Sequence, residues 1–211
     1  DKSETSFQKI NTTINSLDKR VQYHLSSINL GRSKIRNHLG QLAQYEYLLF
    51  LDCDQKVVRS DYIQQYLTHL QSDKVLYGGT TYSATPPNED QLLRWCFGRK
   101  REMIPALRRN ESPHHYFMTN NFLIPKVIFQ SIQFNEDIRQ YGHEDTLFAL
   151  ALKKKKISII HLDNPVEHLG LDNNDAFLQK SAIAIETLIQ LVKAGQPIET
   201  KLLKAYRLLK R

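Results

Sequence analysis

The chain has 211 residues, of which 41% are hydrophobic and 24% are charged, so it suits one globular domain with a substantial core and is not disordered throughout. A formal net charge of +7 admits anionic partners, but no nucleic-acid-binding signature accompanies it, so we expect no nucleic-acid partner. No stretch reaches the roughly 20 apolar residues of a transmembrane helix. Two cysteines without metal-type spacing favour a reducing compartment.

Helix and strand signals alternate along the chain, which predicts an α/β fold. Apolar residues at helical spacing predict helices over 5–17, 35–42, 60–70 (capped by Ser60), 92–97, 144–152 and from about 173 onward, with another opened by Pro125. Strand-like runs occur at 21–25, 48–52, 74–80, 117–124 and 157–162. A loop is expected over 84–90, and a basic loop after Phe97.

The most informative motif is Asp52-Cys53-Asp54, which follows the apolar run 48–51. The run predicts a buried strand, and alternation along the strand would point both carboxylates the same way at its carboxyl end. Open α/β sheets bind their ligands there. Two adjacent carboxylates repel each other, so a hard divalent cation carrying a phosphorylated substrate would explain them. Asp-x-Asp also occurs in ordinary turns, and turn capping is the competing interpretation.

A second acidic motif is Gly142-His143-Glu144-Asp145, which is predicted to begin a helix. Carboxylates in a first helical turn are favoured by the helix dipole, and this alone explains their position. The functional interpretation is a general base that removes a proton from an acceptor hydroxyl.

His168 follows a strand-like run and precedes Leu169-Gly170. A neutral imidazole is a normal ligand for an ion such as Mn²⁺. His161 is an alternative ligand seven residues earlier, and a purely structural histidine is the simpler interpretation of either position.

The order of these motifs resembles the family-two glycosyltransferases, which have the GT-A fold, over roughly residues 1–170. Four further stretches match: Asn29-Leu30-Gly31-Arg32-Ser33, Ile35-Arg36-Asn37, Thr119-Asn120-Asn121-Phe122 and Phe134-Asn135-Glu136. The resemblance implies a GT-A-like mixed sheet flanked by helices in residues 1–170, followed by a C-terminal helical extension in residues 171–211.

The resemblance also implies roles at the metal and the donor. Asp54 would coordinate Mn²⁺ or Mg²⁺ bound to the donor diphosphate, His168 would complete the protein's metal ligands, and Asp52 would contact the metal or the ribose. Arg36 and Asp1 would contact the nucleotide of the donor, for which a UDP-sugar is expected.

For catalysis, the resemblance implies that Asp145 is the base and that Glu144 binds hydroxyl groups of the acceptor or donor. The reaction would be a single displacement that inverts the anomeric carbon. The basic residues between Arg94 and Arg109 would neutralise phosphate or bind an anionic acceptor, with a solvated basic surface as the alternative.

Family members begin with a βαβ unit that holds the nucleotide base and ends near an Asp-Asp-Gly-Ser-like sequence. Asp1-Lys2-Ser3 resembles only the tail of that sequence, so we expect this unit to be absent from the chain. Its absence would expose the edge of a central strand.

The leading hypothesis is therefore an enzyme that transfers a sugar from a nucleotide-sugar to a saccharide or lipid-linked acceptor in bacterial surface polysaccharide or lipopolysaccharide synthesis. A cytoplasmic location is expected. The basic C-terminal helix is suited either to peripheral contact with the inner face of the membrane or, as an ordinary amphipathic helix, to packing on the domain. A non-catalytic binding or assembly subunit is the main alternative. A nucleotidyltransferase is a third hypothesis, although its usual N-terminal glycine-rich loop is missing. The oligomeric state is not predicted.

Overall fold

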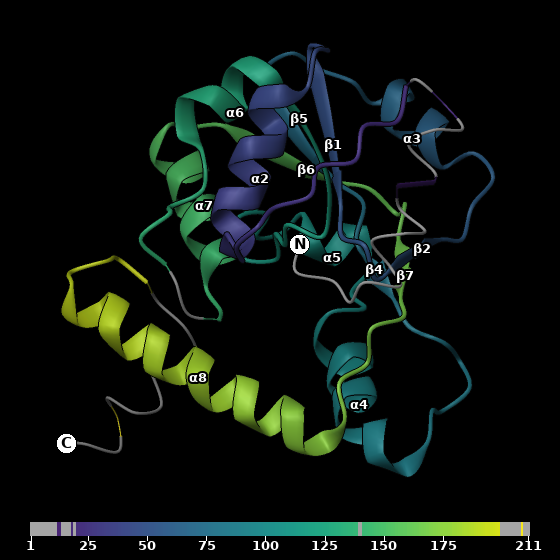
Figure 1. Ribbon diagram of the computed structural model, residues 1–211, viewed down its shortest axis with the longest axis vertical. Coiled ribbons are helices and arrows are strands. Elements are labelled where there is room, and N and C mark those ends of the chain that lie inside the picture. Colours follow the sequence, from purple (N-terminus) through teal and green to yellow (C-terminus); the bar gives the residue numbers. More distant parts are fainter. Residues whose placement is uncertain (1–11, 14–17, 19, 139–140, 199–207, 209–211) are drawn as a thin grey trace.

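The computed structural model describes residues 12–13, 18, 20–138, 141–198 and 208. Its centre is a mixed sheet with the strand order β1-β5-β3-β6, from which a smaller sheet of order β2-β7-β4 continues (Figure 1). The strands of the larger sheet are β1 (Tyr47–Leu51), β3 (Lys74–Tyr77), β5 (Asn121–Pro125) and β6 (Ser158–His161). Those of the smaller sheet are β2 (Gln55–Val57), β4 (Thr80–Thr81) and β7 (Val166–His168). The α/β class predicted from the sequence is thus confirmed.

Each strand of the smaller sheet follows a strand of the larger one along the chain: β2 follows β1, β4 follows β3, and β7 follows β6. In the larger sheet β5 is antiparallel to both β1 and β3, whereas β3 and β6 are parallel. Among the described residues, β1 pairs only with β5, so its other edge carries no partner strand. The short connections between the two sheets meet at one end of the larger sheet, where polar side chains gather.

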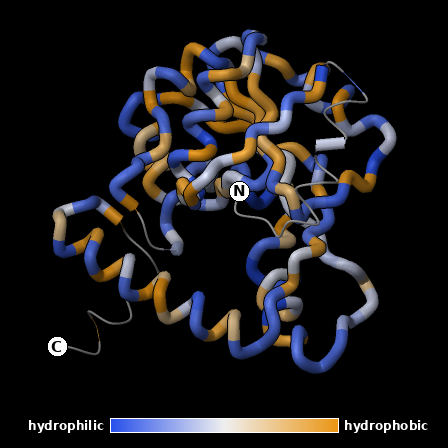
Figure 2. The backbone as a smooth tube through the Cα atoms, in the orientation of Figure 1, coloured by the Kyte–Doolittle hydropathy of each residue, from blue (hydrophilic) through white to orange (hydrophobic). Residues whose placement is uncertain are grey.

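Helices cover both faces of the larger sheet (Figure 1). The helices are α2 (Gly31–Leu42), α3 (Tyr62–Thr68), η1 (Glu89–Gln91), α4 (Leu92–Arg101), α5 (Ala106–Arg109), α6 (Lys126–Ile132), α7 (Glu144–Lys154) and α8 (Asn174–Lys193). Alternation along the strands divides the core into two parts, because successive side chains point to opposite faces. Val75 and Phe122 pack with α6 and α7, whereas Leu76 packs with the tyrosines of α3. Figure 2 shows the hydrophobic character of these central strands.

A buried polar network joins the two sheets. The Asn121 amide oxygen accepts hydrogen bonds from the hydroxyl groups of Tyr62 and Tyr66, both at 2.7 Å. Its amide nitrogen donates to the backbone oxygens of Gly79, at 2.9 Å, and Asn164, at 3.0 Å. All four hydrogen-bonding positions of this amide are therefore used inside the core, where an unpaired polar group is costly.

Helix α8 lies across the molecule from the larger sheet (Figure 1). It contacts α4 near its start and the turn before α7 further along. Near its start, the ring of Phe177 lies 5.4 Å from that of Phe97 in α4. Further along, the backbone oxygen of Ala184 lies 3.0 Å from Nε2 of His143, just before α7. The predicted helix from about residue 173 is confirmed, and the helix is packed on the body of the protein at both contacts.

Several expected elements are wrong in detail. Residues 21–25 have no strand partner among the described residues and run as irregular chain, and residues 117–120 precede β5 instead of belonging to it. Helix α3 starts after Asp61 without a side-chain cap, so Ser60 is not its cap. The basic residues after Phe97 extend α4 to Arg101 instead of forming a loop.

Two predicted helices, at residues 5–17 and in the basic C-terminal segment, fall largely outside the described residues. Within the part of the chain that the structure describes, no helix has the length and apolar content that crossing a bilayer requires.

Candidate functional site

One polar pocket, lined in part by residues from the junction of the two sheets, contains four of the predicted site residues. Asp52, Asp54, Asp145 and His168 all line it. The first pair comes from the β1–β2 connection, Asp145 from the first turn of α7, and His168 from β7. These residues are up to 116 positions apart in the sequence. The sequence showed only the order of their motifs along the chain, and the fold brings the motifs together in one pocket.

Asp52 and Asp54 lie in a tight turn, not on a strand as expected. β1 ends at Leu51, and only Leu48 of the run is fully buried. The Asp52 amide donates to the backbone oxygen of Asn120 at 3.1 Å, and its own carbonyl accepts from the Gln55 amide at 3.2 Å. The turn, instead of strand alternation, therefore brings both carboxylates to the same pocket.

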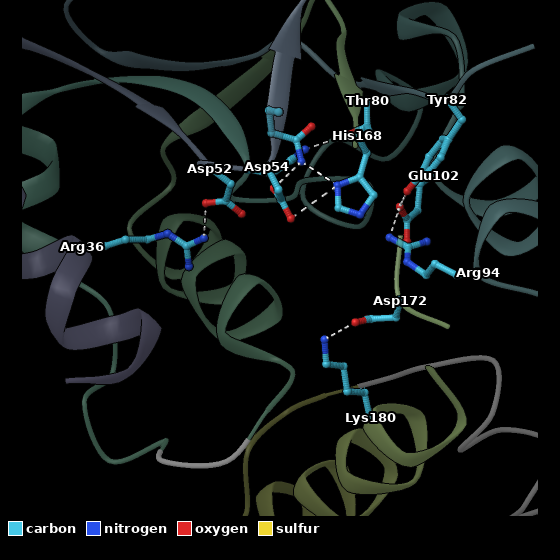
Figure 3. Close-up of polar contacts among 12 residues, drawn as sticks. Arg36, Asp52, Asp54, Thr80, Tyr82, Arg94, Glu102, His168, Asp172 and Lys180 are labelled. Carbon is cyan, nitrogen blue, oxygen red and sulfur yellow. Dashed lines mark hydrogen bonds and ion pairs between the residues drawn. The ribbon is translucent and has the colours of Figure 1, made fainter. Parts of the chain in front are cut away.

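The two carboxylates have different partners (Figure 3). Asp52 accepts a hydrogen bond at 2.7 Å from Arg36, a buried residue whose guanidinium lies over the ring of Phe134. The sequence predicted that Arg36 contacts the nucleotide. In the structure Arg36 forms an ion pair with Asp52 and does not line the pocket. Asp54, in contrast, lies beside His168, with 3.7 Å between its Oδ2 and the imidazole Nδ1.

The antiparallel register of β2 and β7 sets His168 directly opposite Gln55. The Gln55 amide nitrogen lies 2.8 Å from Nδ1 of His168 and donates to Oδ1 of Asp54 at 3.0 Å. Because the amide nitrogen only donates, Nδ1 accepts in this arrangement and the ring proton is on Nε2. Burial lowers the pKa of His168, so the imidazole is neutral at physiological pH, which is the form that binds metals.

Gly170 makes room for the Asp54 carboxylate. A Cβ atom at this position would lie 2.6 Å from Oδ2 of Asp54, well inside van der Waals contact. The Leu169 amide also donates to the Asp54 backbone oxygen at 2.9 Å. The glycine after His168 is therefore part of the site, because it allows the chain to pass close to a carboxylate.

The turn before α7 has an unusual backbone. Gly142 and His143 both have positive φ values, 103° and 67°, and such strain in a non-glycine residue is typical of functional sites. It directs Glu144 and Asp145 into the first turn of the helix. Glu144 is buried and accepts a hydrogen bond at 2.8 Å from Arg32.

Asp145 accepts a hydrogen bond at 2.5 Å from the hydroxyl group of Thr119. Burial, with a further contribution from the Glu144 charge, raises the pKa of Asp145 to about 6. Arg36 and the Thr119 hydroxyl oppose this shift. A carboxylate with such a pKa is ionised at neutral pH and accepts a proton more readily than an ordinary aspartate.

His161, the alternative metal ligand, does not line the pocket. It is 3% exposed, its Nε2 lies 2.9 Å from the backbone oxygen of Pro113, and its ring packs edge-on against Tyr77. Burial lowers the pKa of His161 to about 4, so it is a neutral core histidine. Of the two candidate histidines, His168 is therefore the one that lines the pocket.

Another side of the pocket is formed by Arg94, from the basic stretch singled out in the sequence, and by Tyr82 and Glu102, which no motif indicated. Arg94 bonds Glu102 at 3.1 Å and lies over the ring of Tyr82, whose hydroxyl group also donates to Glu102. Of the basic stretch between Arg94 and Arg109, only Arg94 lines this pocket. Arg109 is instead 3% exposed and bonds the backbone oxygen of Leu162 at 2.8 Å.

Helix α8 and the segment before it supply a further wall (Figure 3). Lys180 bonds Asp172 at 2.6 Å, and its ammonium group also lies 5.8 Å from the ring centroid of Tyr141. On the same ring, the Arg32 guanidinium lies at 5.2 Å. All of these side chains line the pocket. No local pattern indicated them, because they depend on how α8 packs against the turn before α7.

The donor set suits a hard or borderline divalent cation only in part. Among the described residues, no group of three or more His, Cys, Asp or Glu side chains is arranged to hold a metal ion. Asp54 and His168 supply one carboxylate and one neutral imidazole, while Asp52 is bonded to Arg36. Mg²⁺ is commonly held by one or two carboxylates together with substrate phosphates, so this pair fits a cation that arrives with a phosphorylated ligand.

Asp1, the remaining predicted site residue, lies outside the described residues. No model of a known protein family and no curated protein matches this chain.

Proposed function

We propose that this protein is an inverting, metal-dependent glycosyltransferase of GT-A type that uses a nucleotide-sugar donor. The observation that supports it best is the meeting of Asp54, His168 and Asp145 in one pocket. A cation-binding pair and a separate carboxylate of raised pKa are the two chemical components that sugar transfer requires.

Asp54 and His168 would hold Mn²⁺ or Mg²⁺ together with the donor diphosphate. The bound cation would act as a Lewis acid that offsets the charge of the departing diphosphate. The Asp52–Arg36 pair would orient the donor from the neighbouring side of the turn. Arg94 also faces this pocket, and its Nη1 is buried without a partner in the described part of the chain, so it is suited to a phosphate oxygen.

Asp145 would remove the proton from the acceptor hydroxyl as that oxygen attacks the anomeric carbon. The Thr119 hydrogen bond fixes its carboxylate, and Arg32 fixes the adjacent Glu144, which would bind hydroxyl groups. Because base and leaving group act from different walls of the pocket, the displacement would invert the anomeric carbon. The expected acceptor is a saccharide or a lipid-linked saccharide, and the expected location is the cytoplasm or the inner membrane face.

The alternative is a binding or assembly subunit without catalysis. The ion pairs Asp52–Arg36 and Glu144–Arg32 are compatible with it, since they also stabilise the fold. A carboxyl group with a pKa of about 6 at the pocket wall has no evident use in a scaffold, and it favours the enzyme.

The test is titration calorimetry of UDP and GDP with and without Mn²⁺, followed by detection of nucleoside diphosphate release from a panel of UDP- and GDP-sugars. Asp54→Ala should abolish metal-dependent nucleotide binding. Asp145→Asn should keep binding but lose at least about 10²-fold in transfer rate, the usual minimum for a general base. Asp73→Asn, an exposed surface carboxylate, is the matched control. Binding of neither nucleotide by the folded protein would contradict the proposal.

A further inference from the structure

Gln55 is the side chain that connects the two expected metal ligands. It begins β2, immediately after Asp54, and stands directly across from His168 in β7. Its amide nitrogen bonds Oδ1 of Asp54 at 3.0 Å and Nδ1 of His168 at 2.8 Å. One amide group therefore uses both of its N–H donors on one atom from each of the two residues expected to bind the cation.

The position of this nitrogen is informative. A carboxylate oxygen and an unprotonated imidazole nitrogen are both electron-pair donors, and they converge on one point in the pocket. A donor group must occupy that point when no cation does, since otherwise two acceptors face each other unpaired. The Gln55 amide nitrogen thus lies in the place that suits a divalent cation.

The other end of the same amide has no partner. Oε1 of Gln55 is buried and makes no hydrogen bond with any described residue. A buried amide oxygen without a partner is costly and uncommon, and it calls for an explanation. Rotation of the amide group by half a turn, with a shift of the side chain away from Asp54 and His168, would direct this oxygen at the point now held by the nitrogen and leave that point to a cation.

We propose that Gln55 is a third residue of the cation site and offers Oε1 to the metal when the cation enters between Asp54 and His168. Amide oxygens are ordinary ligands of hard divalent cations. Without the cation, the same side chain closes the site with its nitrogen. This inference rests on the proposed function, since it deepens the metal site assigned there.

A simpler role is that Gln55 only fills the space between Asp54 and His168 while no cation is bound. The two roles differ in what removal of the amide does. A metal ligand contributes affinity, so its loss weakens cation binding. A residue that only occupies the site competes with the cation, so its loss leaves binding unchanged or makes it tighter.

The experiment is a titration of the full chain with Mn²⁺ alone and with Mn²⁺ plus UDP. Binding is measured by calorimetry and by the electron paramagnetic resonance signal of free Mn²⁺. Gln55→Leu should weaken Mn²⁺ binding at least about tenfold. Gln55→Glu should bind Mn²⁺ more tightly than the unaltered protein. Gln65→Leu is the matched control, because Gln65 also donates to a carboxylate, that of Asp61 at 2.7 Å, and does not line the pocket.

A second measurement does not depend on any variant of the site. In ¹⁵N-labelled protein, saturating Mg²⁺ should shift the side-chain amide signals of Gln55, because the N–H groups leave Asp54 and His168. These signals are assigned by their loss in Gln55→Leu, whose fold is checked by circular dichroism.

Three results would overturn the inference. Unchanged or tighter Mn²⁺ binding by Gln55→Leu would show that the amide is no ligand, and unmoved amide signals would show that it does not turn. Either result leaves the proposed function intact if Asp54→Asn still abolishes binding. Failure of the unaltered protein to bind Mn²⁺, with or without UDP, would overturn both this inference and the metal-dependent function.

Discussion

The Thr119 hydroxyl group and the Asp145 carboxylate form a 2.5 Å hydrogen bond across 26 residues of sequence. The bond favours the ionised carboxylate and so partly opposes the rise in the pKa of Asp145 that burial causes. Thr119→Val removes the hydroxyl group at nearly constant shape and should therefore raise the pKa of Asp145 further. Titration of the carboxyl ¹³C shift of Asp145 measures this directly, and Thr119→Ser should behave like the unaltered protein. A Thr119→Val titration that coincides with that of the unaltered protein would refute the assigned bond.

A raised pKa also makes Asp145 a source of instability at neutral pH. An aspartate titrates near 3.9 when unfolded but at about 6 here, so the folded protein binds this proton more tightly. Its contribution to the free energy of unfolding is therefore present below about pH 4 and is lost as pH rises through about 6. Asp145→Asn should stabilise the protein by roughly 1–3 kcal/mol near pH 7.5, with little gain near pH 4. Urea denaturation at the two pH values checks this, and an equal gain at both would count against the shifted pKa.

Gly170 provides a test of the site in which Asp54 itself is not replaced. Gly170→Ala introduces a Cβ atom at 2.6 Å from the Asp54 carboxylate, which must then move. We expect Mn²⁺ binding to weaken at least about tenfold, while the melting temperature falls only slightly because the site is at the surface. Leu169→Ala changes an exposed neighbour and serves as the control. Undiminished Mn²⁺ binding by Gly170→Ala would show that the position of Asp54 does not determine affinity.

The Asn121 network should dominate the stability of the junction between the sheets. Asn121→Leu keeps the branched shape of the side chain but leaves the Tyr62 hydroxyl and two backbone oxygens without their partner. Each buried unpaired group costs about 1–3 kcal/mol, so a loss of roughly 3–5 kcal/mol in the free energy of unfolding is expected. Tyr62→Phe removes only one hydroxyl group and should cost about 1 kcal/mol. Chemical denaturation compares the two variants, and equal losses would contradict the central role of the amide.

The parts of the site that follow from local sequence were predictable. Asp52 and Asp54 after an apolar run, and Asp145 at a helix start, are patterns within a few residues, and the structure gathers them in one pocket. Gln55 and Thr119 were not assigned roles, because their partners depend on strand register and on contacts between distant segments. The expected strand at 21–25 failed because alternation indicates only that a strand is compatible with the residues, and pairing requires a neighbouring strand.

The fold class was also within reach of the sequence, since alternating helix and strand signals predict an α/β protein. The finer GT-A assignment stays a proposal based on motif order. The reason for the joint orientation of Asp52 and Asp54 was wrong, although the outcome was right: a turn held by the Asn120 carbonyl orients them, not strand alternation. A turn of this kind depends on a residue nearly 70 positions away.

The packing of α8 on both α4 and the turn before α7 has a consequence for how the protein is made. The wall that holds Lys180 is synthesised after the Asp52–Asp54 turn and the strands around it. On the ribosome, the sheet can form while the pocket is still open on that side, and contacts of such large sequence separation are slow to close. The pocket is therefore completed after the sheet, and a nascent chain halted before α8 would have the sheet but not the complete site.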